Sequence, residues 1–487
     1  MKEINPIATQ IANSPSAKLA AKLADNPMVK AATQMANNPM VKAATPISRI
    51  AQPYAEALQK FSHIEWIGKI PKHWGMCRIK NWASFINGFA FKSNELTTDK
   101  LVPVIRISDI QNGNLDYTSC LTFDYSNRLQ AYLIKHNDII IAMSGATTGK
   151  TALVKSDAMA YINQRVGIIR NAEKYIYYCL NTDMFSEYVN LLSAGSAQPN
   201  ISMGQILNFS IPYISKEKQQ AIADYLDGEC ARIDSIVEKQ RQIIERLKEY
   251  KKSVITEAVT KGLNPNTPMK DSGIGWIGKI PELWEISKLK YYSKYITDGT
   301  HATPEYLADG IPFLSIKDIS AGKLDFSNTK YISQQQHEEL SKHAPIEKGD
   351  ILFTRIGTLG VSVIVETDTA FDIFVSVGLL KPKDNINTKY LNYVMNSEYY
   401  YQYIQLVKAG EGTSAAKFNL SDVSNSPIVC PSLSEQQEIA DYLDKKCVEI
   451  DSIVEKRERM IELMTEYKKS LIYECVTGKK EIVDVME

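Results

Sequence analysis

The chain has 487 residues, 44% of them hydrophobic and 23% charged, and its 56 Lys+Arg balance 56 Asp+Glu. At roughly 100–200 residues per domain this length predicts about three domains, and the composition argues against disorder, a collagen-like repeat, a disulfide scaffold or a membrane span of ~18 apolar residues. Seven scattered cysteines without a C-x-x-C pair indicate a reducing compartment and argue against structural zinc. Because the N-terminus also shows no export signal, we expect a cytoplasmic protein.

Residues 1–60 are rich in alanine and differ from the rest of the chain. The segment NPMVKAAT occurs at Asn26–Thr33 and again at Asn38–Thr45. Each Asn-Pro pair suits a helix N-cap followed by proline at the first helical position. We therefore predict an N-terminal helical extension of short amphipathic helices, with a disordered arm as the alternative.

The chain then contains two similar bodies, predicted at residues 61–212 and 276–431. Each begins with the lead sequence WIGKIP, at Trp66 and again at Trp276. Similar segments follow in the same order in both bodies. They are VPVIRISDI and IPFLSIKDI, then NDIIIAMSG and GDILFTRIG, and finally Asn200-Ile201-Ser202 and Asn419-Leu420-Ser421.

Both bodies have the sequence pattern of a mixed α/β (α+β) fold. Short β-rich runs such as DIIIAM and DILFTR are separated by Gly, Asn and Asp turns. Tyr175–Leu192 and Lys389–Val407 are aromatic-rich and have a helical pattern. A linker with two prolines is predicted at residues 263–275.

Each body is followed by a closely matched tail, predicted as long helices at residues 213–262 and 432–480, with a short tail at 481–487. Ile222–Thr260 and Ile439–Thr477 are identical at 25 of 39 positions without a gap. We expect Ser434 to begin a capping box and Gly262 and Gly478 to end the helices.

A heptad stripe runs along both tails, widened by one position at Val237 and Ile244. It predicts that the two helices pair as an antiparallel coiled coil, related by a pseudo-twofold repeat; the alternative is that each helix packs on its own body. The predicted pairing residues are Leu226, Ile233, Ile236, Ile243, Leu247, Tyr250, Leu443, Ile450, Ile453, Met460, Met464 and Tyr467.

We find no catalytic motif in the sequence. Ser144–Thr151 is similar to a phosphate loop, but only three residues separate its glycines where a Walker A loop has four. A Gly-rich turn between strands explains this segment better. The six histidines form no metal-ligand pattern, and no nucleophile or methyltransferase motif is present. A catalytic site is therefore not visible in this sequence, and we expect no metal or cofactor in this chain.

Charge does not favour binding to nucleic acid by bulk attraction. Residues 66–210 hold 14 Lys+Arg and 10 Asp+Glu, and residues 276–428 hold 15 and 18. A chain that binds DNA with this balance needs a partner to supply many of the phosphate contacts. Two similar bodies held on paired helices nevertheless suit a reader of two half-sites, because spacer length then sets half-site spacing.

The tail motifs resemble the specificity (S) subunit of type I restriction-modification enzymes. The matching segments are Pro431–Asp444, Ile450–Lys456 and Glu466–Gly478, with the first copy at Ile211–Thr260. The W-I-G-x-I-P-x-x-W lead is similar to the family's entry into each target recognition domain. The resemblance covers about residues 61–480.

The resemblance implies two target recognition domains, each reading one half of an asymmetric, bipartite site in double-stranded DNA. It implies that the matched helices join these domains and dock two modification subunits, which methylate adenine N6 with S-adenosylmethionine. Restriction subunits would add translocation and cleavage that use ATP and Mg²⁺, and the S chain itself would not be catalytic. The rival class is a coiled-coil scaffold whose two bodies bind proteins.

Base discrimination favours polar and cationic side chains on loops. Each candidate also has an alternative as an ordinary solvated loop residue. The DNA-binding candidates are Arg106, Ser144, Thr147, Thr148, Lys150, Asn163, Gln164 and Arg165 in the first body, and Thr300, His301, Lys317, Arg355, Thr358 and Lys417 in the second.

Overall fold

The computed structural model describes Ile67 and residues 70–111, 113–155, 157–193, 198–320, 322–408 and 416–482. Its contacts divide the chain into two compact units, a first unit of residues 1–240 with 459–487 and a second unit of residues 241–458. The division falls within two long helices, α9 (Lys216–Lys261) and α14 (Leu433–Val476). The helical extension predicted at residues 1–60 lies outside the described residues.

The body of the first unit combines small sheets with short helices. A four-stranded antiparallel sheet has the order β2-β10-β7-β8, a three-stranded sheet has the order β6-β3-β9, and β1-β11 and β4-β5 form pairs. The strands are β1 (Gly75–Arg78), β2 (Ser84–Asn87), β3 (Val102–Ile105), β4 (Ile110–Gln111), β5 (Asn114–Leu115), β6 (Leu121–Phe123), β7 (Ile139–Ala142), β8 (Thr151–Leu153), β9 (Tyr161–Ile162), β10 (Val166–Arg170) and β11 (Ser210–Tyr213). The helices are η2 (Ile79–Asn81), η3 (Ser93–Glu95), η4 (Ile107–Asp109), η5 (Asn127–Tyr132), α6 (Lys174–Leu180), α7 (Asp183–Ser193) and α8 (Met203–Asn208).

The body of the second unit repeats the two larger sheets of the first and its β1-β11 pair. Its sheets have the orders β15-β21-β18-β19 and β17-β16-β20, with β14-β22 as the corresponding pair and β12-β13 as a further pair before it. The strands are β12 (Met269–Asp271), β13 (Lys279–Pro281), β14 (Glu285–Lys288), β15 (Ser293–Asp298), β16 (Ile311–Leu314), β17 (Lys330–Ile332), β18 (Ile351–Thr354), β19 (Ser362–Ile364), β20 (Asp372–Ile373), β21 (Val377–Pro382) and β22 (Pro427–Cys430). The helices are η6 (Leu289–Tyr291), η7 (Ile316–Asp318), α10 (Gln334–Leu340), α11 (Thr388–Met395), α12 (Glu398–Val407) and α13 (Leu420–Asn425).

The predicted α/β (α+β) class and its duplication are confirmed. In each body one parallel strand pair, β3-β9 or β16-β20, stands among antiparallel pairs. The stretches predicted as helical, Tyr175–Leu192 and Lys389–Val407, are each broken into two helices. In the second body Ser397 lies between the two helices and caps the start of α12, because its hydroxyl accepts a hydrogen bond from Tyr400 N.

Alternation along the strands divides each core into two layers. Ile139 and Ile141 of β7 join the cluster that includes α6 and α7, whereas Ile140 joins the cluster on the opposite face of the sheet. In the second body Leu352 and Phe353 of β18 separate in the same way. Because successive side chains of a strand point to opposite faces, a strand buried on both faces needs the continuous apolar runs seen in this sequence.

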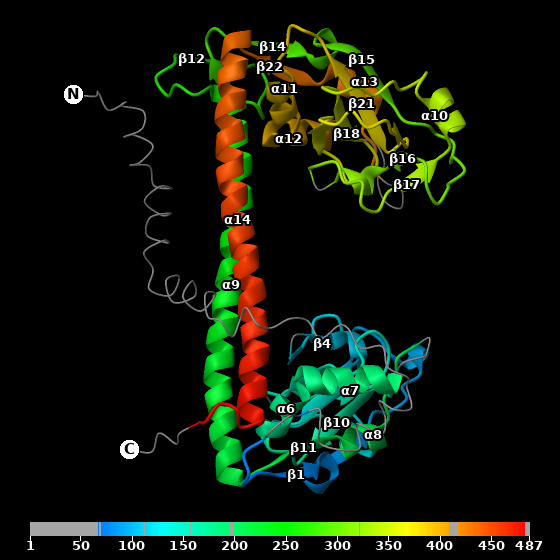
Figure 1. Cartoon of the computed structure of the whole chain (residues 1–487), viewed down its shortest axis with the longest axis vertical. Coiled ribbons are helices and arrows are strands. Elements are labelled where there is room, and N and C mark those ends of the chain that lie inside the picture. Colours follow the sequence, from blue (N-terminus) through cyan, green and yellow to red (C-terminus); the bar gives the residue numbers. More distant parts are fainter. Residues whose placement is uncertain are drawn as a thin grey trace, which may run out of the picture. The chain divides into compact units, whose positions relative to one another are not determined.

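Segments of α9 and α14 lie side by side and antiparallel within each unit (Figure 1). In the first unit Lys468 Nζ is 2.7 Å from Asp234 Oδ1, and in the second unit Lys251 Nζ is 2.6 Å from Asp451 Oδ2. Residue numbers rise along one helix as they fall along the other, which is the signature of antiparallel pairing. The fold prediction of paired helices is thus confirmed over its helix-packing alternative.

The buried seam between the helices differs by one position from the simplest heptad assignment. Leu226, Ile233 and Val237 are buried in the core of the first unit, whereas Ile236 is only half-buried. In the second unit Ile244 is buried and Ile243 is half-buried. Val237 and Ile244, which the sequence placed at the margin of the stripe, therefore belong to the seam itself.

One aspartate on each long helix binds two side chains of the body that precedes it in sequence. In the first unit Asp227 accepts a hydrogen bond of 2.5 Å from the Tyr178 hydroxyl and pairs with Lys174 Nζ at 2.5 Å. In the second unit Asp444 accepts a bond of 2.8 Å from the Tyr393 hydroxyl and another of 2.6 Å from Lys389 Nζ. Both aspartates occupy the last position of the repeated IADYLD segment. These contacts give that repeat a structural reason.

The helix ends confirm one sequence prediction and correct another. Gly262 and Gly478 adopt the positive φ angles of 75° and 71° that terminate helices, a conformation that favours glycine. The capping box of α14 begins at Ser432, not at Ser434: the Ser432 hydroxyl contacts Glu435 Oε2 at 2.8 Å and accepts from Glu435 N at 3.3 Å. Ser434 already lies inside the helix.

Candidate nucleic-acid interface

Three loops of the first body are held together by main-chain hydrogen bonds. Met143 N donates to Arg165 O, Ile201 N donates to Met143 O, and Gly145 N donates to Pro199 O, each at 2.9 Å. These bonds join the Gly-rich turn after β7, the turn between β9 and β10, and the loop before α8. The frame does not depend on the side chains that these loops present.

The three loops enclose an open polar cleft with a volume of about 710 Å³. It combines amide, hydroxyl and guanidinium groups, which are the side chains that read base edges. The lining residues are Asn87, Met143, Ser144, Gln164, Arg165, Gln198, Asn200, Ile201, Ser202, Met203 and Gly204.

Ser144, Gln164 and Arg165, three of the predicted DNA-binding residues, are brought together in this cleft. Gln164 and Arg165 are exposed at the turn between the strands. Ser144 retains 8% of its surface, and its hydroxyl has no hydrogen-bond partner. A buried hydroxyl without a partner is unfavourable unless a ligand or water satisfies it.

The second body contains the same main-chain frame. Arg355 N donates to Ser376 O at 3.0 Å, Phe418 N to Arg355 O at 2.8 Å, and Gly357 N to Ala416 O at 2.9 Å. Met143 therefore corresponds to Arg355 and Arg165 to Ser376.

This frame corrects one part of the sequence alignment. Ile201 corresponds to Phe418, so Ser202 before α8 matches Asn419 before α13. The alignment of Asn200-Ile201-Ser202 with Asn419-Leu420-Ser421 is two residues out of register.

Equivalent positions in the two bodies carry different chemistry. Where the first body has Asn87 and Met143, the second has Asp298 and Arg355, and these two form a buried ion pair. Arg355 also donates to the carbonyls of Val375 and Phe418. Its guanidinium thus ties three segments together, so Arg355, a predicted DNA-binding residue, is buried and paired within the fold.

The other candidates of the first body lie outside the cleft. Thr147 and Thr148 use their hydroxyls on backbone carbonyls, Ile107 O at 3.2 Å and Gly145 O at 2.7 Å. Arg106 donates to Ser119 O at 3.1 Å. Lys150 is exposed, and Asn163 is half-buried at the start of the turn that carries Gln164. The Gly-rich turn itself connects β7 to β8, as predicted.

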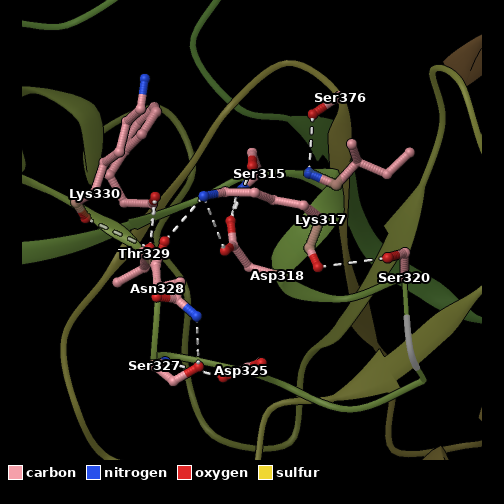
Figure 2. A network of polar contacts seen from close by, with 12 residues as sticks. Ser315, Lys317, Asp318, Ser320, Asp325, Ser327, Asn328, Thr329, Lys330 and Ser376 are labelled. Atoms are coloured by element: carbon pink, nitrogen blue, oxygen red, sulfur yellow. Dashed lines mark hydrogen bonds and ion pairs between the residues drawn. The ribbon is translucent and has the colours of Figure 1, made fainter. Parts of the chain in front are cut away.

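The candidates of the second body are dispersed over several loops. His301 Nε2 lies 3.2 Å from Asp298 Oδ2, and the adjacent Thr300 hydroxyl contacts Ala302 O at 3.3 Å. Thr358 and Lys417 are exposed. Figure 2 shows the Lys317 side chain directed to the loop of Asn328, whose carbonyl accepts a bond of 2.9 Å.

Sequence reasoning missed Asn87, Asn200 and Ser202 in the cleft, together with Asp298 in the second body. Asn87 ends β2 next to a glycine whose Cβ would lie 2.0 Å from Asn163 O. Gly299, which follows Asp298, is enclosed in the same way, since its Cβ would lie 1.9 Å from Ile373 O. A polar residue followed by glycine at the end of a strand was therefore the signal that the sequence offered in both bodies.

Among the described residues, no group of three His, Cys, Asp or Glu side chains could hold a metal ion. Burial raises the pKa of Cys77 to about 11 and that of Cys120 to about 12, so these thiols stay protonated near neutral pH. Over the same described ranges, no helix has both the length and the apolar character to cross a bilayer.

The structure thus defines a duplicated protein whose two α/β bodies are mounted on antiparallel helix segments. Residues 71–249 and 281–462 each match the family model described as "Type I restriction modification DNA specificity domain". The two matches span most of the chain. The chain belongs to this family and carries two copies of its domain.

Relatives and a solved structure agree with this assignment. The EcoBI specificity subunit of Escherichia coli is 25% identical over 86% of this chain and 88% of its own length. The MjaVIII specificity subunit of Methanocaldococcus jannaschii is 23% identical over 84% of this chain and 94% of its own length. A solved chain from work on assembly and conformational transition of the type I R-M system matches 85% of this chain with a TM-score of 0.62 at 17% identity, which supports the fold.

Proposed function

We propose that this chain is the DNA sequence-specificity subunit of a type I restriction-modification complex, and that each body reads one half of an asymmetric, bipartite site in double-stranded DNA. The observation that carries the proposal is that one main-chain frame recurs in both bodies with different side chains upon it. A protein that recognises two different half-site sequences with one fold needs a shared main-chain frame and different side chains on it. Base edges discriminate through side chains, whereas the backbone only positions them.

The helices supply the surfaces for partners in this proposal. Ile236, Ile243 and Tyr467 remain half-buried in the single chain, so part of the apolar stripe is left for other subunits. We infer that two modification subunits dock there and methylate adenine N6 with S-adenosylmethionine. Restriction subunits that use ATP and Mg²⁺ would complete the complex. The chain itself would contribute no catalytic group and act inside the cell.

The near-zero net charge of the chain is consistent with phosphate contacts that are shared with other subunits. The whole chain has 56 cationic and 56 acidic residues, so it offers no bulk attraction to phosphate. Modification subunits would then provide the phosphate contacts, and this chain would provide selectivity.

Long-read methylation sequencing tests the proposal directly. The full chain is co-expressed with its modification subunit in a host that lacks adenine methylation. The expected result is one split motif with a fixed gap, methylated at adenine on both strands. Genomic DNA without any motif, from cells in which the two subunits co-purify, would favour a protein-binding scaffold instead.

A further inference from the structure

The turn between β9 and β10 and its counterpart between β20 and β21 carry side chains of different chemistry. In the first body Gln164 and Arg165 are both exposed at the rim of the polar cleft. In the second body the equivalent pair is Val375, which is half-buried, and Ser376, which is buried. The Ser376 hydroxyl accepts a bond of 3.3 Å from Ile316 N, so it is used inside the fold.

We propose that Gln164 and Arg165 are the purine-reading pair of the first body, and that Ser144 takes part by giving its hydroxyl to the same base edges. This inference rests on the proposed function and deepens it by naming the reading residues. Gln pairs in bidentate fashion with adenine N6 and N7, and Arg with guanine O6 and N7. Val375 offers only an apolar surface, which suits a thymine methyl group.

Three observations support the assignment. The frame bond from Met143 N to Arg165 O fixes the turn by its backbone and leaves the Arg165 side chain to project. Ser144 lines the cleft, is nine-tenths buried and has no partner for its hydroxyl, so the cleft contains an unsatisfied polar group. Asn87 and Asn200, from two other loops, add amide groups to the same lining.

The test replaces the turn with its own counterpart from the second body. Gln164→Val with Arg165→Ser installs the Val-Ser pair that the equivalent turn already accommodates, so the fold should tolerate it. The full chain is co-expressed with its modification subunit, and the methylated motif is sequenced. In one half of the split motif, we expect the preference for the cognate purine over other bases to fall about 5- to 150-fold at one or two positions. The other half should be unchanged.

A matched control removes the same chemistry elsewhere in the first body. Arg128 and Gln130 are exposed in η5, and neither lines the cleft. Arg128→Ser with Gln130→Val changes charge and polarity equally. It should leave both halves of the motif intact, even if total methylation falls through weaker contact with phosphate.

A separate variant tests Ser144. Ser144→Ala removes a buried hydroxyl that has no partner in the protein, so thermal stability should stay level or rise. Discrimination at one base pair of the same half-site should nevertheless weaken. A loss of stability with an unchanged motif would show that the hydroxyl has an internal structural role.

Each outcome has one reading. A wild-type complex without any motif refutes the proposed function. A wild-type motif that the Val-Ser variant leaves unchanged in both halves refutes the reading pair alone. If the variant methylates nothing, purified complexes select duplexes from a randomised library: loss of preference in one half supports the proposal, and retained preference in both halves contradicts it.

Discussion

Lys468 Nζ lies 2.7 Å from both carboxylate oxygens of Asp234. The pair has a twin in the other unit, Lys251 with Asp451 at 2.7 and 2.6 Å. Adding the repeat spacing of 217 turns Asp234 into Asp451 and Lys251 into Lys468. The duplicated tails therefore make the same contact twice, once within each unit.

The first prediction concerns this twin contact. Lys468→Glu places a carboxylate beside Asp234 and should lower the stability of the first unit by about 1 kcal/mol, since exposed pairs contribute modestly. Asp234→Lys in the same chain should recover most of the loss by restoring an opposite pair. Hydrogen exchange of peptides from the two long helices measures the change. If the double variant loses as much stability as the two single variants together, the pairing is contradicted.

The second prediction concerns the aspartates that fasten the bodies. Asp227→Asn weakens the acceptor for Tyr178 and removes the ion pair with Lys174, and should destabilise the attachment of the first body by about 1–3 kcal/mol. Asp444→Asn should do the same in the second unit. Hydrogen exchange should rise in α6 for one variant and in α11 for the other.

Asp224→Asn is the matched control for that experiment. Asp224 lies on the same helix, is exposed and accepts a hydrogen bond from Gln220 Nε2 at 2.8 Å. It should change exchange in neither body. Equal effects of Asp224→Asn and Asp227→Asn would mean that the charge of the helix, and not the contact with Tyr178, is what matters.

The third prediction contrasts two glycines. Gly149 has a φ of 85°, and a Cβ there would lie 3.0 Å from Val189 Cγ2. Gly149→Ala should lower stability by about 1–2 kcal/mol through backbone strain alone. Gly228 is exposed and lies well inside the length of α9, and a Cβ there would have nothing within 4 Å. Gly228→Ala should therefore raise stability by up to about 1 kcal/mol. Thermal unfolding followed by circular dichroism should move in opposite directions for the two variants.

The fourth prediction is a dependence on pH at the start of α14. Partial burial raises the pKa of Glu435, but hydrogen bonds from the Trp284 indole and from Ser432 bring it below its usual value of 4.5. A carboxylate with a lowered pKa in the folded state stabilises the fold above its unfolded pKa, and this contribution is lost as pH falls through the folded pKa.

Glu435→Gln should therefore destabilise the second unit at pH 7 by about 1 kcal/mol, the usual effect of a lost cap. The difference from the unaltered chain should shrink as pH falls below the usual value. Glu438→Gln, on an exposed face of the same helix, is the control. Midpoints of denaturant unfolding at a series of pH values measure the difference, and a constant gap across the series would exclude Glu435 as the titrating group.

Local patterns predicted much of this fold from the sequence. The repeat spacing placed both long helices, and glycine chemistry placed their ends at Gly262 and Gly478. The seam shifted to Val237 because the orientation of the partner helix decides which neighbouring stripe faces inward. Periodicity along one helix cannot decide this.

The site depended on contacts that are distant in sequence. Arg355 pairs with Asp298, 57 residues earlier, so its burial could not be read from its own segment. The sequence alignment matched Asn200 to Asn419 because both are asparagines close to the start of a short helix. The main-chain hydrogen bonds show that Asn419 matches Ser202 instead, so the alignment was two residues out of register. Gln164 and Arg165 could be named as candidates because an exposed polar turn is visible in the local sequence. Their position beside Ser144 in one cleft could not be predicted in this way, because it depends on contacts between distant segments.

The loops around the cleft are tied to one another through N–H and C=O groups that every amino acid except proline supplies in full. If these side chains select base pairs as proposed, a substitution at Gln164, Arg165 or Asn200 changes sequence preference and leaves the main-chain bonds that hold the loops intact. Specificity for a new DNA sequence can then evolve by single codon changes, through variants that still fold.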